Sequence, residues 1–129
     1  MTASPFSPGF RFSLADGLIL LAGATGGAVL AETSFWLGAM VVCVVLHFFL
    51  FCNVFRISRG PELVWGGVFT GLAVGTILVG VPGWPVTFMA AVMLSGGLIW
   101  RETRKPWYHG ICWQRWNPEL PKWWEERDR

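Results

Sequence analysis

His47 is the residue most able to carry chemistry, because it lies near the middle of a long apolar stretch. An ionisable side chain inside a membrane span is a candidate functional residue by default. We favour a neutral imidazole that hydrogen-bonds a serine or threonine of another helix. Two alternatives stay open: axial ligation of a haem or a chlorophyll-type pigment, and a proton relay. For haem b no other span offers a second histidine, and for a relay the nearest carboxylate is Asp16.

Three hydroxyl residues lie at a comparable depth in the other predicted helices: Thr25, Thr70 and Ser95. With His47 they predict one polar layer in the middle of a helical bundle. Such a layer would also line the path of a small transporter or channel. Cys43 lies one turn before His47 on the same helix face, where its small side chain would leave room for a macrocycle.

Glycines recur every four residues in two of the predicted helices. The first set is Gly23 and Gly27, and the second is Gly67, Gly71 and Gly75. A stripe of this kind lets two helix backbones approach closely in a membrane. We expect these glycines to pack helices of this chain together, with a second chain as the alternative.

The helices that hold these residues are predicted from hydropathy. Of the 129 residues, 53% are hydrophobic and 14% charged, and the mean hydropathy is +0.50. Two charge-poor stretches are each long enough for two spans, since one span takes about 20 residues. We expect an all-α membrane protein, a four-transmembrane-helix bundle at residues 14–101, with spans near 14–31, 35–55, 62–81 and 84–101.

The first span has a competing interpretation as a cleaved signal peptide. Arg11 precedes the apolar run, and Val29-Leu30-Ala31 at its end makes a passable cleavage site. The long arm before the run and its single charge favour an uncleaved span. We therefore expect residues 1–13 to form a cytoplasmic arm that is disordered or lies on the surface.

All ten lysines and arginines fall on one side of this four-span arrangement. They are Arg11, Arg56, Arg59, Arg101, Arg104, Lys105, Arg115, Lys122, Arg127 and Arg129. The turns on the other side hold only Glu32. Because cytoplasmic loops are rich in Lys and Arg, we expect an N-in/C-in topology in a membrane of the bacterial inner (plasma) membrane type.

Residues 102–129 are predicted to form a cytoplasmic, interfacial tail. Three prolines exclude one long helix. The tail holds five tryptophans: Trp107, Trp113, Trp116, Trp123 and Trp124. Tryptophan among Arg and Lys favours the lipid headgroup layer, and docking of a protein partner is the alternative. His109 and Cys112 alone make a weak case for a metal site.

The remaining sequence signals exclude several classes of function. There is no Gly-rich phosphate loop, no Ser/His/Asp set and no HExxH motif. The three cysteines show no metal or disulfide framework, and the basic residues follow the membrane rule, so we expect no nucleic-acid partner.

We therefore expect a non-enzymatic accessory or scaffold subunit that contacts membrane lipids. It would pack against a larger membrane complex or against copies of itself. The alternatives are a pigment- or haem-binding subunit with His47 as axial ligand, and a small transporter or channel.

Overall fold

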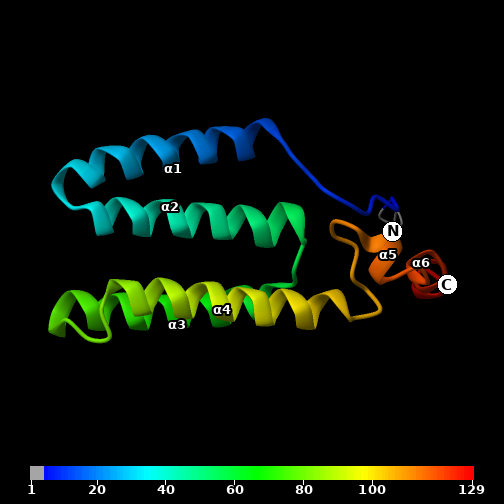
Figure 1. Cartoon of the computed structure of the whole chain (residues 1–129). Helices are drawn as coiled ribbons and strands as arrows, with labels where there is room; N and C mark the ends of the chain where they lie inside the picture. The colour runs from blue at the N-terminus through cyan, green and yellow to red at the C-terminus, as the bar shows by residue number, and fades with distance from the viewer. Residues whose placement is uncertain (1–4) are drawn as a thin grey trace.

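Two helical hairpins lie side by side in the computed structural model, which describes residues 5–129 (Figure 1). The first hairpin consists of α1 (Leu14–Thr33) and α2 (Phe35–Phe49). The second consists of α3 (Arg59–Val79) and α4 (Trp84–Thr103). All regular secondary structure within the described residues is helical, as the sequence predicts.

Three helices in the described part of the chain are long and apolar enough to cross a membrane. They are α1, α3, and α2 together with its continuation, one stretch of π-helix named η1 (Leu50–Val54). The chain thus has the helices of an integral membrane protein. The fourth predicted span coincides with α4, which has 20 residues but lacks the apolar character of the other three. The count of four spans stays a prediction.

The start of α1 is fixed by a local hydrogen-bond pair. Ser13 donates to the Asp16 carboxylate from both its backbone nitrogen and its hydroxyl, at 2.7 and 2.6 Å. The Asp16 backbone N–H donates back to the Ser13 hydroxyl, which completes a capping box. The Asp16 carboxylate therefore serves the helix terminus and lies apart from the buried His47.

Close backbone approach joins α1 to α2. A Cβ atom on Gly27 would lie 2.6 Å from a Val42 methyl group, and one on Gly23 would lie 2.7 Å from a Val45 methyl group. A Cβ on Gly38 of α2 would in turn clash with the backbone of α1. The structure thus places the first predicted glycine set in a contact between helices.

The second glycine set lies differently. Gly67 and Gly71 are exposed, and a Cβ atom on either would meet nothing within 4 Å. Gly75 approaches only the carbonyl of Val81 in the turn that follows α3, at 2.8 Å from its ideal Cβ. The expected packing within the chain therefore fails for Gly67 and Gly71, because α3 turns another face toward its neighbours.

That other face of α3 is aromatic and fills the space between the hairpins. Trp65 stacks on His47 of α2 with ring centroids 3.6 Å apart and planes 7° apart. Phe69 stacks on Trp65 at 5.0 Å and meets Phe88 of α4 at 6.2 Å, while Phe51 lies 4.3 Å from His47. We name these five rings the aromatic column. It is the principal contact between the two hairpins.

Two tryptophans extend the aromatic column to the end with the hairpin turns. Trp36 at the start of α2 stacks on Trp84 at the start of α4, with centroids 6.3 Å apart. Both also contact Phe88, at 6.0 and 5.9 Å. The hairpins are therefore joined by rings over most of their length.

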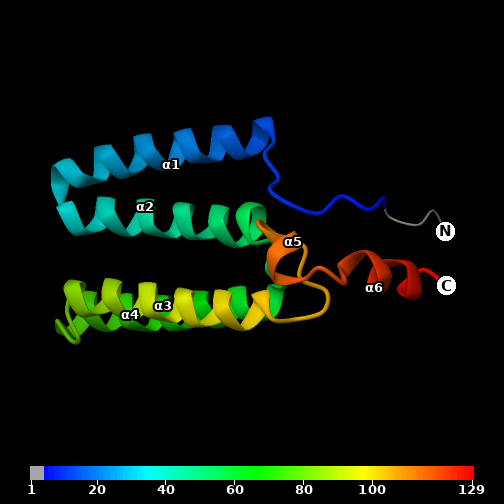
Figure 2. The ribbon, with the colours of Figure 1, turned by 45° about the vertical axis from the view of Figure 1, so that its right-hand side comes forward.

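The arm from residue 5 onward and the C-terminal segment both lie at the opposite end of the hairpins, as Figures 1 and 2 show. The C-terminal part includes α5 (Trp113–Trp116) and α6 (Leu120–Arg127). We name residues 5–13, 55–58 and 104–127 together the end cap. Residues 1–4 of the predicted arm lie outside the described residues.

Backbone hydrogen bonds hold the end cap together. The Gly9 N–H donates to the His109 carbonyl at 2.7 Å, and the Ile111 N–H donates to the Val54 carbonyl at 2.8 Å. The Phe6 ring meets the edges of Trp113 and Trp124 at 5.8 and 5.5 Å. The described part of the arm therefore packs against the tail, although most of its residues remain exposed at the surface.

Replacing Gly27 by leucine should push α1 away from α2. Overfilling a close contact of this kind costs about 1–3 kcal/mol, so the thermal unfolding midpoint in mild detergent should fall. The matched control is Gly26→Leu in the same helix, where a Cβ meets nothing within 4 Å. Equal melting curves for the two variants would contradict the close approach.

Candidate functional site

The buried polar site is built around His47, which is 8% exposed. Both imidazole nitrogens lie close to the Ser95 hydroxyl of α4, Nε2 at 3.1 Å and Nδ1 at 3.2 Å. The Ser95 hydroxyl donates its one proton to the Ala91 carbonyl at 2.6 Å. It is therefore the acceptor for the imidazole N–H.

The indole of Trp65 completes this site from α3. Its Nε1 donates to the same Ala91 carbonyl at 3.1 Å. We name His47, Trp65, Ala91 and Ser95 the histidine network. Because it satisfies polar groups from three helices inside the bundle, it holds α2, α3 and α4 together.

The predicted polar layer is only partly assembled. Ser95 meets His47 directly, and Thr70 lines a cavity of about 140 Å³ that His47 also lines. Thr25 is exposed on α1, and its hydroxyl has no hydrogen-bond partner within residues 5–129. The sequence fixes the depth of a residue along a helix but leaves its direction open, which explains this outcome.

One polar pair of the bundle interior was missed by the sequence analysis. Thr76 of α3 and Thr87 of α4 hydrogen-bond through their hydroxyls at 3.0 Å, and Thr87 is fully buried. The Gly83 N–H also donates to the Thr76 hydroxyl at 3.3 Å. The pair joins α3 to α4 near their shared turn.

The surroundings of His47 do not fit a haem or a chlorophyll-type macrocycle. Axial ligation needs one ring nitrogen with open space in the ring plane. Here both nitrogens face Ser95 within 3.2 Å, and Trp65 covers one ring face at 3.6 Å. A macrocycle would have to break the histidine network and separate the helices.

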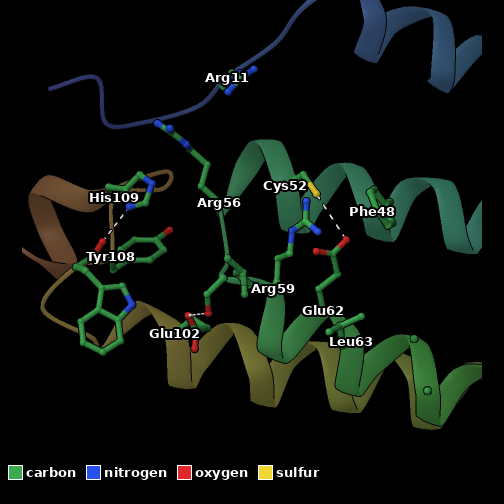
Figure 3. Close-up of a pocket in the computed structure, with 15 residues that line it drawn as sticks. Arg11, Phe48, Cys52, Arg56, Arg59, Glu62, Leu63, Glu102, Tyr108 and His109 are labelled. Atoms are coloured by element: carbon green, nitrogen blue, oxygen red, sulfur yellow. Dashed lines mark hydrogen bonds between the residues drawn. The ribbon is translucent and has the colours of Figure 1, made fainter. Parts of the chain in front are cut away.

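A second candidate site lies at the boundary between the hairpins and the end cap. It is a groove of about 780 Å³. Figure 3 shows three arginines around it: Arg11 from the arm, Arg56 from the connection after η1, and Arg59 from the first turn of α3. We name this the arginine groove.

The arginine groove carries an excess of positive charge. Among the described residues, none of its three arginines has a carboxylate within 4.0 Å. Of the two acidic side chains in the lining, Glu102 is paired with Lys105 and accepts from Ser58 at 3.1 Å. The other is Glu62, whose oxygen lies 3.8 Å from the Cys52 sulfur.

Arg56 is held in place by unusual local geometry. Its φ of +49° is a left-handed conformation that non-glycine residues seldom adopt. The guanidinium donates to the Ser7 carbonyl of the arm at 2.5 Å. Partial burial, and then the charge of Arg11, lower the pKa of Arg56. An anion placed between these guanidinium groups would relieve their repulsion.

Tyr108 and His109 line the groove from the tail. The Tyr108 hydroxyl donates to the Ile111 carbonyl at 2.8 Å, and burial raises the pKa of Tyr108. The His109 Nδ1 lies 2.8 Å from the Trp107 carbonyl, and burial lowers the pKa of His109. Both side chains thus stay neutral at pH 7. Within the described chain no group of three His, Cys, Asp or Glu side chains is arranged to hold a metal ion.

The five tail tryptophans divide into two groups. Trp113 and Trp124 pack on Phe6 of the arm, and Trp123 contacts Trp124 at 6.2 Å. Trp107 and Trp116 remain 43% and 46% exposed. The second group thus presents the more exposed rings to a lipid or a partner.

Comparison with known proteins gives no match to this chain among family models, curated proteins or solved structures. Its function must therefore be inferred from its own residues. The histidine network joins helices, and the arginine groove has the charge to bind an anion.

Ser95→Ala, which removes the hydroxyl, should destabilise the bundle by about 1 kcal/mol, because His47 then loses its hydrogen-bond acceptor. A double-mutant cycle with His47→Phe, which keeps a ring on Trp65, isolates this bond. The double variant should lose less stability than the sum of the two single variants. Thermal unfolding in detergent measures all four proteins, and strict additivity would contradict the network.

The end cap should loosen in acid through His109. Its folded pKa lies below the unfolded value of about 6.5. The unfolded chain therefore binds more protons, and stability is lost as the pH falls below that value. The hydrogen bond to the Trp107 carbonyl raises the pKa of His109, whereas the charges of Arg56 and Arg127 lower it further.

Limited proteolysis of the tail from about pH 7.5 to about pH 5 measures this loss. The control is His109→Gln, which retains a donor for the Trp107 carbonyl. Its cleavage should change less over the same range. A response equal to that of the wild type would exclude His109 as the cause.

Proposed function

We propose that the protein is a non-enzymatic scaffold subunit of a membrane complex, with four spans and both termini in the cytoplasm. The observation that carries this proposal is an uncovered face of α3. It comprises Val64, Gly67, Gly71, Val74 and Leu78, and we name it the glycine face. All five residues are exposed, and they follow the spacing of a helix–helix contact.

The glycine face has the composition that membrane helices use to associate. Open space surrounds the ideal Cβ positions of Gly67 and Gly71, while Val64 and Leu78 are 52% and 76% exposed beside them. In lipid no hydrophobic effect draws helices together, so close backbone approach and shape supply the contact. A transmembrane helix of a larger complex fits this face, with the glycines at the crossing point.

The distribution of charge supports the topology. Every lysine and arginine belongs to a segment at the end of the hairpins that carries the end cap. The two turns at the other end contain no basic residue, as Figure 1 allows the reader to follow. The positive-inside rule then favours a cytoplasmic end cap. As a helix, α4 is about 30 Å long, enough to span the hydrocarbon core.

The interior gives no support to the alternatives. The polar groups of the histidine network are satisfied by hydrogen bonds among the described residues. Its surroundings do not fit a macrocycle. The scaffold role needs neither a bound macrocycle nor a transport path.

Purification of the tagged protein from its native membrane in mild detergent tests the scaffold role. We expect a stoichiometric membrane partner, identified by mass spectrometry, which is lost in Gly71→Leu. The control is Gly66→Leu, which adds the same side chain to an open site of α3 outside the glycine face.

Three outcomes separate the possibilities. Loss of the partner in Gly71→Leu alone supports the glycine face as its binding site. A cross-linked dimer of the chain, disrupted by the same variant, would identify the occupant as a second copy. A lone monomer in both detergent and native nanodiscs would refute the scaffold role.

A further inference from the structure

The arginine groove continues into the membrane part of the molecule. Its apolar wall includes Phe48 of α2 and Leu63 and Gly66 of α3. Phe48, Glu62 and Gly66 also line the cavity of about 140 Å³ beside His47 and Thr70. The groove and this cavity are therefore neighbours between α2 and α3, and their linings together extend from the charged end toward the middle of the bundle. We name this pair of hollows the chain path.

The length of this path matches half of a bilayer. Arg59 and Thr70 mark its two ends on α3. At 1.5 Å of rise per residue they lie about 16 Å apart along the helix axis. The hydrocarbon core of one leaflet is about 15 Å deep. The lining residues thus extend over the depth that an acyl chain covers between the headgroup layer and the bilayer midplane.

Gly66 creates the open space in the wall of the path. A Cβ atom there would meet nothing within 4 Å, although the residue is partly buried and lines the same cavity as Phe48. Phe48 and Leu63 are 56% and 73% exposed and supply apolar contact on either side. This surface suits a hydrocarbon chain better than a soluble ligand.

We propose that the arginine groove binds one anionic phospholipid of the adjacent leaflet. The phosphate lies among Arg11, Arg56 and Arg59, and one acyl chain follows Phe48 and Gly66 toward the bilayer midplane. Guanidinium groups bind phosphate with paired, charge-assisted hydrogen bonds, and the low dielectric of the headgroup layer strengthens them. The bound phosphate supplies a close negative charge, since among the described residues no carboxylate lies within 4.0 Å of these arginines.

Glu62 narrows the choice of headgroup. Its carboxylate lines both the groove and the cavity, and its only recorded partner within the described residues is the Cys52 thiol at 3.8 Å. A second negative charge on the lipid would be repelled there. A headgroup with one phosphodiester charge and hydroxyl donors, as in phosphatidylglycerol, satisfies both the arginines and this acceptor.

The lipid site is independent of the scaffold role. The two surfaces lie on different sides of α3, with Gly66 in the groove and Gly71 on the glycine face, and only Gly67 borders both. The lipid site needs the charged end of the bundle to lie at a membrane surface. It needs no partner protein.

Binding to the delipidated full-length protein in detergent tests the proposal. The probes are phosphatidylglycerol, phosphatidylcholine and inorganic phosphate, and native mass spectrometry detects the bound species. We expect phosphatidylglycerol to bind in a one-to-one complex and to exceed phosphatidylcholine in affinity. Arg59→Gln should weaken phosphatidylglycerol binding about fivefold.

Filling the chain path tests the second half of the site. Gly66→Leu places a four-carbon side chain in the path. Displacing about two methylene groups of the acyl chain should weaken binding about tenfold with every charge retained. The matched controls are Gly71→Leu and Arg101→Gln, which lie outside the groove lining and should bind like the wild type. Lipid-free melting curves identify any variant that is misfolded.

Several results would overturn the proposal. Equal affinity for phosphatidylcholine would remove the role of the arginines. Full competition by inorganic phosphate would show a site for a free anion in place of a lipid. Wild-type affinity in both Arg59→Gln and Gly66→Leu, with both variants folded, would exclude the groove altogether.

Discussion

The contact of His47 with Trp65 and Ser95 is the interaction on which the arrangement of the two hairpins depends. The first hairpin approaches the second chiefly through aromatic rings, and this contact adds a buried hydrogen bond between α2 and α4. Since lipid supplies no hydrophobic drive for helices to associate, such a contact must rest on shape and satisfied polar groups. The parallel stack of His47 on Trp65 at 3.6 Å supplies the complementary shape. The Ser95 hydroxyl satisfies the polar imidazole.

The part of this arrangement that depends on position along the chain was predictable. Hydropathy located the long helices to within a few residues, and their all-helical character is confirmed. The prediction that His47 and Ser95 lie at a similar depth along their helices correctly placed them near each other. The same reasoning grouped Thr25 with them, although that side chain is exposed on α1. Depth fixes a residue along the helix axis, whereas the direction of its side chain depends on tertiary contacts that a single sequence does not reveal.

The long-range contacts of the end cap lay beyond prediction for the same reason. Phe6 and Trp124 are at opposite ends of the chain and meet at 5.5 Å. The arginine groove likewise collects residues from the arm, the α2–α3 connection and α3. Each of these segments has an unremarkable local signal. The charges of these segments come together because both ends of the chain fold against the same end of the hairpins.

The rotation of α3 about its own axis links the candidate surfaces. With about 100° between successive residues, Trp65 and Phe69 point to the aromatic column, Gly66 to the arginine groove, and Gly71 outward. The large rings decide this rotation because they have the most surface to bury, and the glycines take the faces that remain. A partner helix on the glycine face would stand beside Gly67, at the edge of the groove. It would therefore cover the open side of the lipid site. In this arrangement α3 would contact the core, a lipid and a partner helix with different faces.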